Sequence, residues 1–560
     1  MKQESKEKFT VTNNIDLQTV VFTTLLIEKS PQAIPLGAAC VASAVKNHKA
    51  TKDSCQTKLL VFNKEDKSFV NNSQTDDKAA SYIAQEILKE KPAICGFSIF
   101  VWNKSILEKA AKILKENGVI CIAGGPEVTA HPEVFTDFDY TICGQGEAKV
   151  PKLIWNILSK NQTPPPPSSK SAQTLDSDFP QTLDSFPSPY LDGTINPAEY
   201  EGALWELARG CPFKCSYCYE SKGEQKVSMF PASRIEQELD LFAKLKVPQV
   251  FVLDPTYNAN KQRALELLKL IAKKTPNTFY YFEARAEFID KELAKAFTKI
   301  PCSLQIGLQS SNEETLKLVH RPFNRKQFIK NINILNQTGV TFGFDVIYGL
   351  PKESINGFKE SINFAISLYP NNLELFCLSV LPGTDLYDRA SELNLKFQSE
   401  PPYNIIETSH FSKEDVKKAA KISNACNIFY NQGRAVPWFN TICQCLKIKP
   451  AQFFILFAQF LEQEKINIDC NSASHKEIEK LQKDFIKKIF TEKKLQKQLA
   501  VAIDLISLHG AMSRKTASGK SEEVYLSYPA EFLTSEYAFN LDFFANNVIM
   551  KKNKIKIWRQ

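Results

Sequence analysis

Short apolar runs that alternate with amphipathic stretches are the feature that most restricts the fold of this chain. Between residues 17 and 160, strand-like runs such as 19–26 and 119–125 are separated by stretches of helical periodicity such as 36–48 and 104–118. Continuous apolar strands joined by helices are typical of a parallel sheet covered on both faces. We therefore predict an α/β protein whose first part is a Rossmann-like domain.

The alternation resumes between residues 201 and 385. Strand-like runs, the first at 203–210 and the last at 372–381, are again separated by helical stretches, and we count six strand–helix units. This pattern favours a partial (β/α)6 barrel, in which chemistry takes place at the carboxyl ends of the strands. From about residue 386 onward the pattern is mainly helical, and no catalytic motif is evident there.

A stretch rich in Pro and Ser, with the sequence QTLDS occurring twice, separates the two alternating parts and is typical of a semi-extended linker. The predicted domains are a Rossmann-like domain (1–160), a linker (161–200), a barrel core (201–395) and a mostly helical C-terminal domain (396–560).

Composition places the chain among reduced, cytoplasmic proteins. The first residues lack the apolar core of a signal peptide, and the longest apolar run, 453–461, is too short to span a bilayer. The fourteen cysteines are therefore expected to be thiols or metal ligands rather than disulfides. A net charge of +8 over 560 residues is mild, and we expect neither a nucleic-acid partner nor a membrane span.

Three cysteines, Cys211, Cys215 and Cys218, follow the first strand of the second alternating part in a C-x3-C-x2-C arrangement. Three thiolates would leave one iron of a cubane iron–sulfur cluster without a protein ligand, and an open iron can carry out chemistry. A structural zinc site would need a fourth ligand, which is not evident because no His lies between His131 and His320. The spacing thus favours iron–sulfur over zinc. The pair Cys443 and Cys445 has no second pair nearby, which disfavours a metal site there.

The segment CPFKCSYCYE resembles the signature of the radical S-adenosylmethionine (SAM) superfamily. The resemblance implies that the three cysteines hold a [4Fe–4S] cluster and are the catalytic metal ligands. It also implies that the unique iron chelates SAM, and that the reduced cluster cleaves SAM to methionine and a 5′-deoxyadenosyl radical.

Further segments at the strand ends, FEARAE, IGLQSSNEETLKLVHR and FGFDVIYGLPKES, extend the resemblance through the barrel. It implies that Tyr217 lies beside the adenine of SAM, and that Glu283, Arg285 and Gln309 line the SAM and substrate pocket. Asp254 also ends a strand and is a further candidate cofactor-binding residue. A strand-end ion pair is the alternative explanation for Glu283 and Arg285.

The first alternating part resembles the cobalamin-binding domain that is fused to many radical SAM enzymes. The segments GFSIFVWN, AGGPEVTAHPE and CGQGEAKVPKL carry this resemblance. The implied cofactor-binding residues at the strand ends are Ser98, Gly124, Gly125, Pro126, Gly144, Gly146 and Glu147. Because the cobalt-ligating motif D-x-H-x-x-G is absent, we predict cobalamin without a protein His on cobalt; loss of cobalamin is the open alternative. Taken singly, each loop is also explained by ordinary turn glycines.

The resemblance as a whole implies a radical SAM enzyme, with cobalamin, that transfers a methyl group to an unactivated carbon. The alternatives are a cyclisation or rearrangement with or without cobalamin, and, in a different class, a non-catalytic iron–sulfur protein for electron transfer or sensing. The expected partners are a small-molecule or peptide substrate and a flavodoxin- or ferredoxin-type electron donor.

Overall fold

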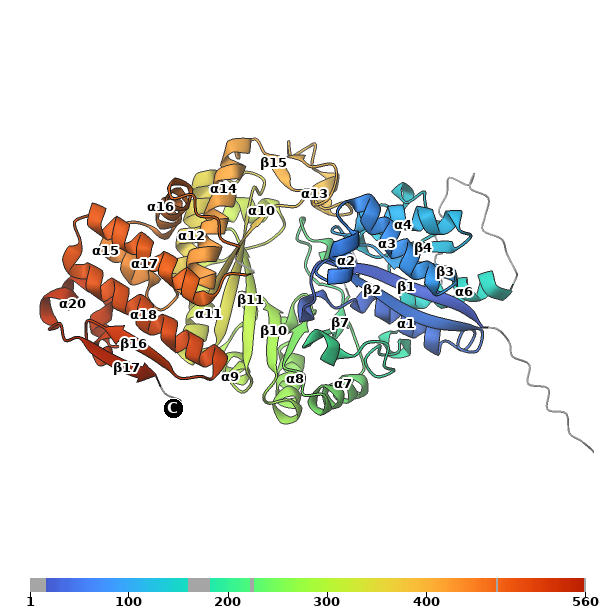
Figure 1. The fold of residues 1–560 in the computed structure, drawn as a ribbon, viewed down its shortest axis with the longest axis horizontal. Coiled ribbons are helices and arrows are strands. Elements are labelled where there is room, and N and C mark those ends of the chain that lie inside the picture. The colour runs from blue at the N-terminus through green and yellow to red at the C-terminus, as the bar shows by residue number, and fades with distance from the viewer. Residues whose placement is uncertain (1–16, 160–181, 222–225, 470–471, 558–560) are drawn as a thin grey trace, which may run out of the picture. The chain divides into compact units, whose positions relative to one another are not determined.

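The computed structural model describes residues 17–159, 182–221, 226–469 and 472–557, and they divide into two compact units (Figure 1). Unit 1 comprises the chain up to Leu204 together with Phe230–Val247, and unit 2 comprises Trp205–Met229 together with the chain from Pro248 onward. Each unit is described by itself.

Unit 1 contains a five-stranded parallel sheet in the order β2-β1-β3-β4-β5. Helices cover both of its faces, and each face has its own apolar core. The predicted Rossmann-like parallel sheet is thus confirmed. The strands are β1 (Gln18–Leu26), β2 (Cys55–Asn63), β3 (Pro92–Ser98), β4 (Ile120–Gly124) and β5 (Tyr140–Ile142). The helices are α1 (Leu36–Asn47), α2 (Lys67–Asn72), α3 (Asp76–Lys89), α4 (Lys104–Glu116), α5 (Pro126–Ala130) and α6 (Gly146–Ser159).

The direction in which successive strands are added to this parallel sheet reverses between β1 and β3, because β2 lies on one side of β1 and β3 lies on the other. In open parallel sheets, ligands bind outside the carboxyl ends of the strands at such a point. The hydroxyl of Thr24, near the end of β1, donates to the carbonyl of Ser98 at the end of β3 over 2.9 Å. By this rule, a ligand of unit 1 is expected at the edge around Ser98.

Residues 182–200 differ from the extended linker that we predicted for 161–200. They form two short 3-10 turns, η3 (Leu183–Ser185) and η4 (Pro197–Tyr200), and pack against α1. The carboxylate of Asp192 accepts hydrogen bonds from Ser43 (2.7 Å) and Asn47 (2.6 Å), both on α1. These bonds explain why the stretch is folded. The proline run and the first QTLDS copy lie outside the described residues. Helix α7 (Ala232–Lys244) also belongs to unit 1.

Unit 2 contains strands β9 to β13 of a six-stranded sheet in the open order β13-β12-β11-β10-β9-β6, and the edge strand β6 spans the division between the units at Leu204. The four pairings from β9 to β13 are parallel. The predicted partial barrel is confirmed. The strands are β6 (Ala203–Trp205), β9 (Gln249–Val252), β10 (Phe279–Ala284), β11 (Cys302–Gln309), β12 (Thr341–Tyr348) and β13 (Asn372–Cys377).

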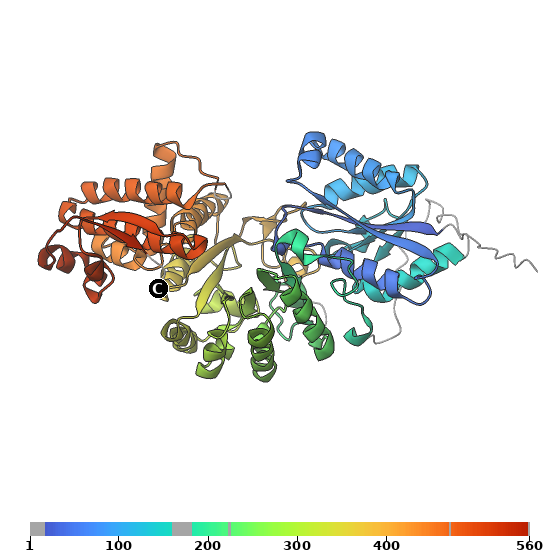
Figure 2. The same ribbon diagram turned by 60° about the horizontal axis from the view of Figure 1, so that its bottom comes forward.

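Side chains alternate across this sheet, as expected for strands. Phe282, Leu304 and Phe344 are buried on the side that the helices cover, whereas Glu283, Gln305 and other polar residues point to the opposite side. Figure 2 shows the green and yellow helices along one side of the strands. These helices are α8 (Lys261–Lys274), α9 (Lys291–Phe297), α10 (Glu313–Leu318), α11 (Arg325–Thr338) and α12 (Ile355–Ser367).

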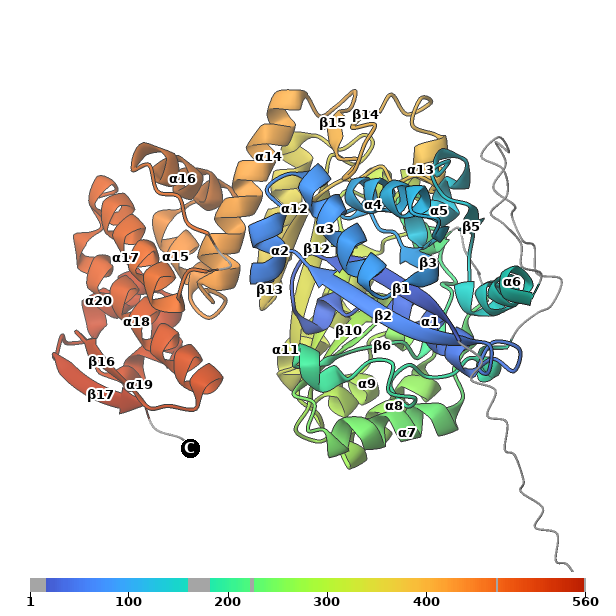
Figure 3. The ribbon, with the colours of Figure 1, turned by 45° about the vertical axis from the view of Figure 1, so that its right-hand side comes forward.

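The C-terminal region is mainly helical, as predicted, and its first elements cover the edge strand β13 (Figure 3). The side chain of Asn431 accepts from the Leu373 backbone N–H (2.9 Å) and donates to the Leu373 carbonyl (3.0 Å). Ser423 donates to the carbonyl of Leu375 over 2.7 Å. These side chains thus form hydrogen bonds with backbone groups of the edge strand, which could otherwise pair with another strand.

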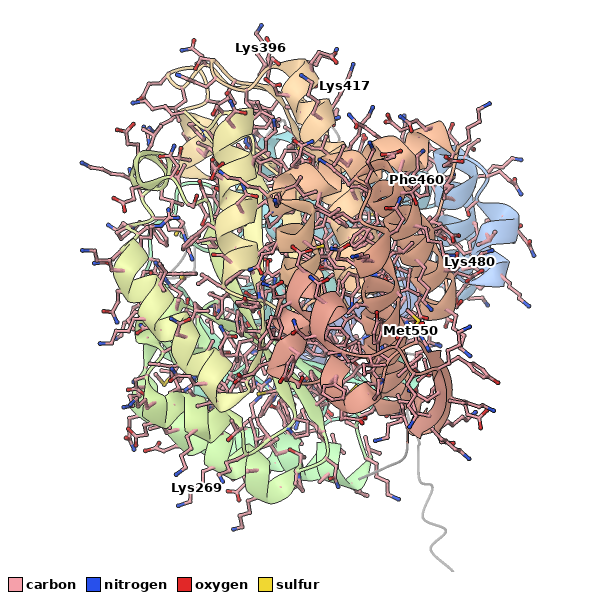
Figure 4. The ribbon with its side chains drawn as sticks, turned by 90° about the vertical axis from the view of Figure 1, so that its left-hand side faces the viewer. Lys269, Lys396, Lys417, Phe460, Lys480 and Met550 are labelled. Carbon is pink, nitrogen blue, oxygen red and sulfur yellow. The ribbon has the colours of Figure 1, made fainter. Side chains whose placement is uncertain are left out.

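Phenylalanine rings that pack edge to face around Phe429 form the core of this region. Figure 4 looks onto its helices, where Phe460 and Lys480 are labelled. The elements are α13 (Asp385–Asp388), β14 (Lys396–Phe397), β15 (Ile405–Glu407), α14 (Lys413–Cys426), the π-helical turn η8 (Asn427–Gln432), α15 (Phe439–Leu446), α16 (Pro450–Gln463), α17 (His475–Glu492), α18 (Gln496–Ser518), β16 (Glu522–Leu526), α19 (Ala530–Leu533), α20 (Leu541–Asn547) and β17 (Asn553–Ile557).

Candidate active site

The three cysteines of the motif lie on one loop of unit 2, between the short strands β7 (Ala208–Arg209) and β8 (Ser228–Met229). Gly210, which has a φ of 91°, makes the turn directly before Cys211. Cys211 and Cys215 are buried and Cys218 is half-buried. The backbone N–H of Cys218 donates to the carbonyl of Cys215 over 3.0 Å, which folds the second half of the motif into a tight turn.

Two other segments of unit 2 hold this loop through backbone hydrogen bonds. The N–H of Ser216 donates to the carbonyl of Val319 (3.1 Å), and the N–H of Leu386 donates to the carbonyl of Ser216 (2.8 Å). Tyr217 packs on an apolar cluster that includes Leu350. Hydrogen bonds and apolar packing therefore hold the loop from several sides.

Burial and the proximity of other thiols favour the neutral thiol at Cys211 and Cys218. Burial raises the pKa of Cys211, and the nearby Cys215 adds to this. Burial also raises the pKa of Cys218 to about 11, and Cys215 and Cys211 contribute. Three thiolates in this loop would thus need a positive partner, and iron of an iron–sulfur cluster supplies one. Among the described residues, no group of three or more Cys, His, Asp or Glu side chains is placed so that it could hold a metal ion. In a cubane cluster, each thiolate would bind a different iron.

Arg321 is a functional candidate that the sequence did not single out. Its Nη1 donates to Sγ of Cys215 over 3.8 Å, and its Nη2 donates to the carbonyl of Gly307. Burial opposes its charge, but Tyr217 and Cys215 favour it, so the pKa of Arg321 lies above the ordinary value. The guanidinium therefore places a positive charge at the cysteine loop. The segment LVHR was visible in the sequence, but only the fold brings its Arg to Cys215.

Arg285, predicted as a pocket residue, also reaches the cysteine loop. Its guanidinium carbon lies 3.8 Å from the centre of the Phe213 ring, which stands between Cys211 and Cys215 in the sequence. Its Nη2 donates to Glu287 over 2.7 Å, and its Nε is buried with no hydrogen-bond partner among the described residues. The predicted strand-end ion pair thus exists, but Arg285 forms it with Glu287.

Gln309 ends β11 in a left-handed conformation with a φ of 66°, where the pairing of β11 with β12 shifts register. A Cβ atom at Gly307 would lie 2.4 Å from Nε2 of Gln309 and 3.0 Å from Nη2 of Arg321, so glycine is needed there. The Oε1 atom of Gln309 is buried and has no partner among the described residues. Gln309 and Arg321 therefore meet over Gly307, beside the cysteine loop.

Glu283 lies on the side of the sheet that helices do not cover, two residues before Arg285. Desolvation by the surrounding protein, followed by the charge of Asp345, raises the pKa of Glu283 to about 8, and because the side chain is exposed to solvent its effect on stability is small. Burial also raises the pKa of Asp345 to about 6, with a further contribution from Glu374, while a hydrogen bond from Gln305 (2.5 Å) opposes it. We call Glu283, Asp345 and Glu374 the acidic face.

The raised pKa of Glu283 predicts a pH-dependent stability. Because the pKa of Glu283 is higher in the folded than in the unfolded protein, the protein loses stability as the pH rises from the unfolded pKa of 4.5 to the folded pKa of about 8. Glu283→Gln should therefore melt near the wild-type temperature at pH 5 and about 2 °C higher at pH 9. Differential scanning calorimetry at both pH values checks this, with the surface substitution Glu266→Gln as the control. An equal difference at both pH values would contradict it.

Asp254 is buried and makes its contacts within the protein. Its Oδ1 accepts from the backbone N–H groups of Leu207 (2.9 Å) and Ala208 (3.0 Å), and its Oδ2 accepts from Arg263 (3.1 Å). These bonds hold the chain just before the cysteine loop. They account for the residue without a ligand, so its cofactor role stays a prediction.

In unit 1, the predicted cobalamin-binding residues lie at the carboxyl ends of β3, β4 and β5 or directly after them. They are Ser98, Gly124, Gly125, Pro126, Gly144, Gly146 and Glu147. A Cβ at Gly125 would lie 2.5 Å from the carbonyl oxygen of Ile99, and one at Gly146 would lie 2.8 Å from Val41. These two glycines are thus explained by close packing.

Gly144 differs from the packed glycines. It has a φ of 74°, is exposed, and a Cβ there would meet nothing within 4 Å. At Gly124 a Cβ would make only ordinary contacts near 3.9 Å. Neither Gly124 nor Gly144 places a side chain at this edge of the sheet, so a large ligand could approach the backbone closely there.

None of the helices in the described part of the chain has both the length and the apolar character that a bilayer span requires.

Comparison with known proteins divides the chain in a similar way. Residues 205–365 match the Radical SAM superfamily, and residues 391–554 match the family described as "Protein of unknown function (DUF4080)". The chain is 27% identical to the cobalamin-dependent radical SAM methyltransferase TokK of Streptomyces tokunonensis, over 53% of this chain and 48% of TokK. It is 24% identical to an uncharacterised methyltransferase of Pyrococcus horikoshii, over 69% of this chain and 85% of that protein. The chain thus spans about half the length of TokK.

Two solved structures share the fold. The cobalamin-dependent radical enzyme OxsB with aqua-cobalamin bound has a TM-score of 0.57 at 15% identity, and the likeness covers 86% of this chain and 81% of OxsB. The methyltransferase TsrM of Kitasatospora setae with tryptophan substrate and a SAM analogue bound has a TM-score of 0.52 at 13% identity, covering 71% and 82%. Residues 205–365, which match the Radical SAM superfamily, include the cysteine loop after β7 and most of the six-stranded sheet, so this part of the chain is a radical SAM domain, as the sequence predicted.

Proposed function

We propose that this protein is a radical SAM enzyme that reductively cleaves SAM at a [4Fe–4S] cluster held by Cys211, Cys215 and Cys218. The observation that carries the proposal is the convergence on one loop of three cysteines and two arginines. Arg321 contacts Cys215, and Arg285 contacts Phe213 between two of the cysteines. Two cations and an unpartnered amide oxygen beside the cysteines are suited to binding a zwitterionic ligand, a task that a non-catalytic iron–sulfur protein does not have.

The residues around the loop have distinct tasks in this proposal. When bound and reduced, the cluster supplies the electron that breaks a carbon–sulfur bond of SAM. Arg285 and Arg321 offer donors for a carboxylate. Gln309 offers its unpartnered amide oxygen as an acceptor. Tyr217, packed on the apolar cluster next to the loop, offers a ring face for the adenine.

We further propose that unit 1 binds cobalamin and that the reaction is methyl transfer to an unactivated carbon. The glycine edge at Gly124 and Gly144 and the names of the relatives TokK and TsrM support this. The early loop after β1 contains no His for cobalt. Cyclisation or rearrangement is the alternative, with cobalamin absent or acting as an electron carrier. Ser98 and Glu147, at the same edge, complete the proposed cofactor residues.

The acidic face, on the side of the sheet that helices do not cover, is the proposed substrate side. We propose that the substrate is a small molecule or a peptide and that the electron donor is of the flavodoxin or ferredoxin type. The predicted domain limits and the cytoplasmic location also stay proposals.

Cobalamin content and product analysis separate the two reaction types. Protein purified from cells supplied with cobalamin should carry about one cobalamin per chain, measured from its corrin absorbance after denaturation. Methyl transfer should also yield S-adenosylhomocysteine in addition to 5′-deoxyadenosine when substrate is present. Cluster-loaded protein that forms 5′-deoxyadenosine but retains no cobalamin would reject methyl transfer and favour the alternative. If the protein carries an intact cluster but forms no 5′-deoxyadenosine, the proposal that it is a radical SAM enzyme would be rejected.

A further inference from the structure

A fully buried carboxyl group lies behind the strand end that carries Gln309. Glu353, just before α12, has 0% of its surface exposed. Its Oε1 accepts from the hydroxyl of Ser310 over 3.0 Å, and its Oε2 has no partner among the described residues. A Cβ at Gly357 would come within 3.0 Å of Oε1, so the glycine in the first turn of α12 leaves room for the carboxyl group.

Ser310 connects this carboxyl group to the turn that follows β11. The hydroxyl that donates to Glu353 also accepts from the backbone N–H of Asn312 over 3.0 Å. The neighbouring N–H of Ser311 donates to the hydroxyl of Ser361, on α12, over 2.9 Å. Both Ser310 and Ser361 are fully buried. Two side chains from the chain around α12 thus hold Ser310 and Ser311, and Ser310 in turn holds the backbone of Asn312.

The turn holds Gln309 in a conformation that is unfavourable for a residue with a Cβ. The φ of Gln309 is 66°, and the N–H of Ser310 bonds back to the carbonyl of Leu308 over 2.9 Å. A left-handed residue of this kind persists only where its surroundings hold it. Because Ser310 is the next residue, its bond to Glu353 is a direct restraint on the backbone of Gln309.

The same turn begins the segment that reaches the cysteine loop. Asn312 caps α10 by accepting from the N–H groups of Glu314 and Thr315. After α10, the carbonyl of Val319 holds Ser216, and Arg321 contacts Cys215. Displacement of the turn would therefore move Gln309 directly and Arg321 through a short helix.

We propose that Glu353 is a positioning residue for the SAM site, which anchors the turn after β11 and so holds Gln309 and Arg321 in place. The inference rests on the proposed function, because it concerns the binding of SAM. Glu353 is too deeply buried to touch a ligand itself. Burial raises the pKa of Glu353 to about 8, against the opposing hydrogen bond from Ser310. The neutral carboxylic acid is thus favoured at pH 7, which makes glutamine its closest substitute.

The test compares Glu353→Ala and Glu353→Gln in the full-length, cluster-reconstituted protein. Equilibrium dialysis with radiolabelled SAM gives the dissociation constant, and iron and sulfide analysis gives the cluster content. We expect Glu353→Ala to retain its cluster and to bind SAM about tenfold more weakly. Glu353→Gln retains an acceptor for Ser310 and should stay within about threefold of wild type. The control is Glu360→Gln, an exposed glutamate on α12.

Ser361→Ala serves as a second variant in case Glu353→Ala does not fold, because it removes the acceptor for Ser311 and should weaken SAM binding by about threefold. Wild-type affinity in both Glu353→Ala and Ser361→Ala, or an equal loss in Glu353→Gln and Glu353→Ala, would overturn the inference. The proposed function is tested separately in the same preparations, since wild-type protein that binds a cluster but does not cleave SAM would reject that function whatever Glu353 does.

Discussion

Replacement of Cys215 by alanine is expected to abolish the formation of 5′-deoxyadenosine from SAM, to about one thousandth of the wild-type rate or less. Cys215 is the central cysteine of the loop, is buried, and receives a hydrogen bond from Arg321. With two thiolates left, the loop cannot hold three irons of a cubane. Reconstituted Cys215→Ala should therefore lack the broad absorbance of the cluster at about 400 nm and contain less than about one iron per chain.

Cys445→Ala is the matched control for this variant. Cys445 is a half-buried free cysteine on α15 in the C-terminal region, far along the chain from the loop. Its substitution should leave the absorbance, the iron content and the rate unchanged. Full cluster content in Cys215→Ala would show that the three cysteines are not the ligand set, and would remove the basis of the proposed function.

Arg321→Gln is expected to lower the rate of SAM cleavage by about 100-fold while most of the cluster is retained. The guanidinium contacts Cys215 and the carbonyl of Gly307 at once, and it lies beside the amide of Gln309. Glutamine is neutral and shorter, so it removes the positive charge and at least one of these contacts. The rate of 5′-deoxyadenosine formation under anaerobic conditions with dithionite measures the effect, and iron analysis measures the cluster.

Arg321→Lys should fall between the wild type and the glutamine variant. Lysine keeps the positive charge but lacks the planar fork that reaches two partners. Arg325→Gln, a nearby arginine on α11 whose guanidinium packs over Phe364, is the control. If Arg321→Gln lost its cluster in proportion to its activity, the residue would serve the cluster loop alone and not SAM.

The sheets of both units could be predicted from sequence because their strands are long apolar runs between amphipathic helices. The strand-like run 302–309 coincides with β11, and the run 340–349 extends beyond β12 by one residue at each end. Prediction was poorer where structure depends on a few polar contacts. The stretch 182–200 folds against α1 through the carboxylate of Asp192, and no periodicity in the sequence reveals such a bond. The π-helical turn η8 likewise depends on contacts with β13, which is distant in sequence.

The candidate site shows a similar division. The cysteine spacing is local, so the loop could be recognised from sequence alone, and Arg285 and Gln309 could be placed because they end strands. Arg321 could not be predicted as a site residue, because it follows a short helix and only the fold brings it to Cys215. The role of Glu353 could not be predicted for the same reason, because its hydrogen-bond partner Ser310 lies 43 positions away in the sequence. Asp254 also ends a strand, but its oxygens accept hydrogen bonds from the backbone of Leu207 and Ala208 and from Arg263, so its cofactor role stays a prediction.

The formation of 5′-deoxyadenosine by the anaerobically reconstituted wild-type protein, with SAM and dithionite, tests the central claim most directly. Liquid chromatography with mass spectrometry should detect it together with methionine in a one-to-one ratio, and Cys215→Ala treated identically should give none above background. Wild-type protein that carries a complete [4Fe–4S] cluster and binds SAM, yet forms no more 5′-deoxyadenosine than Cys215→Ala, would contradict the account.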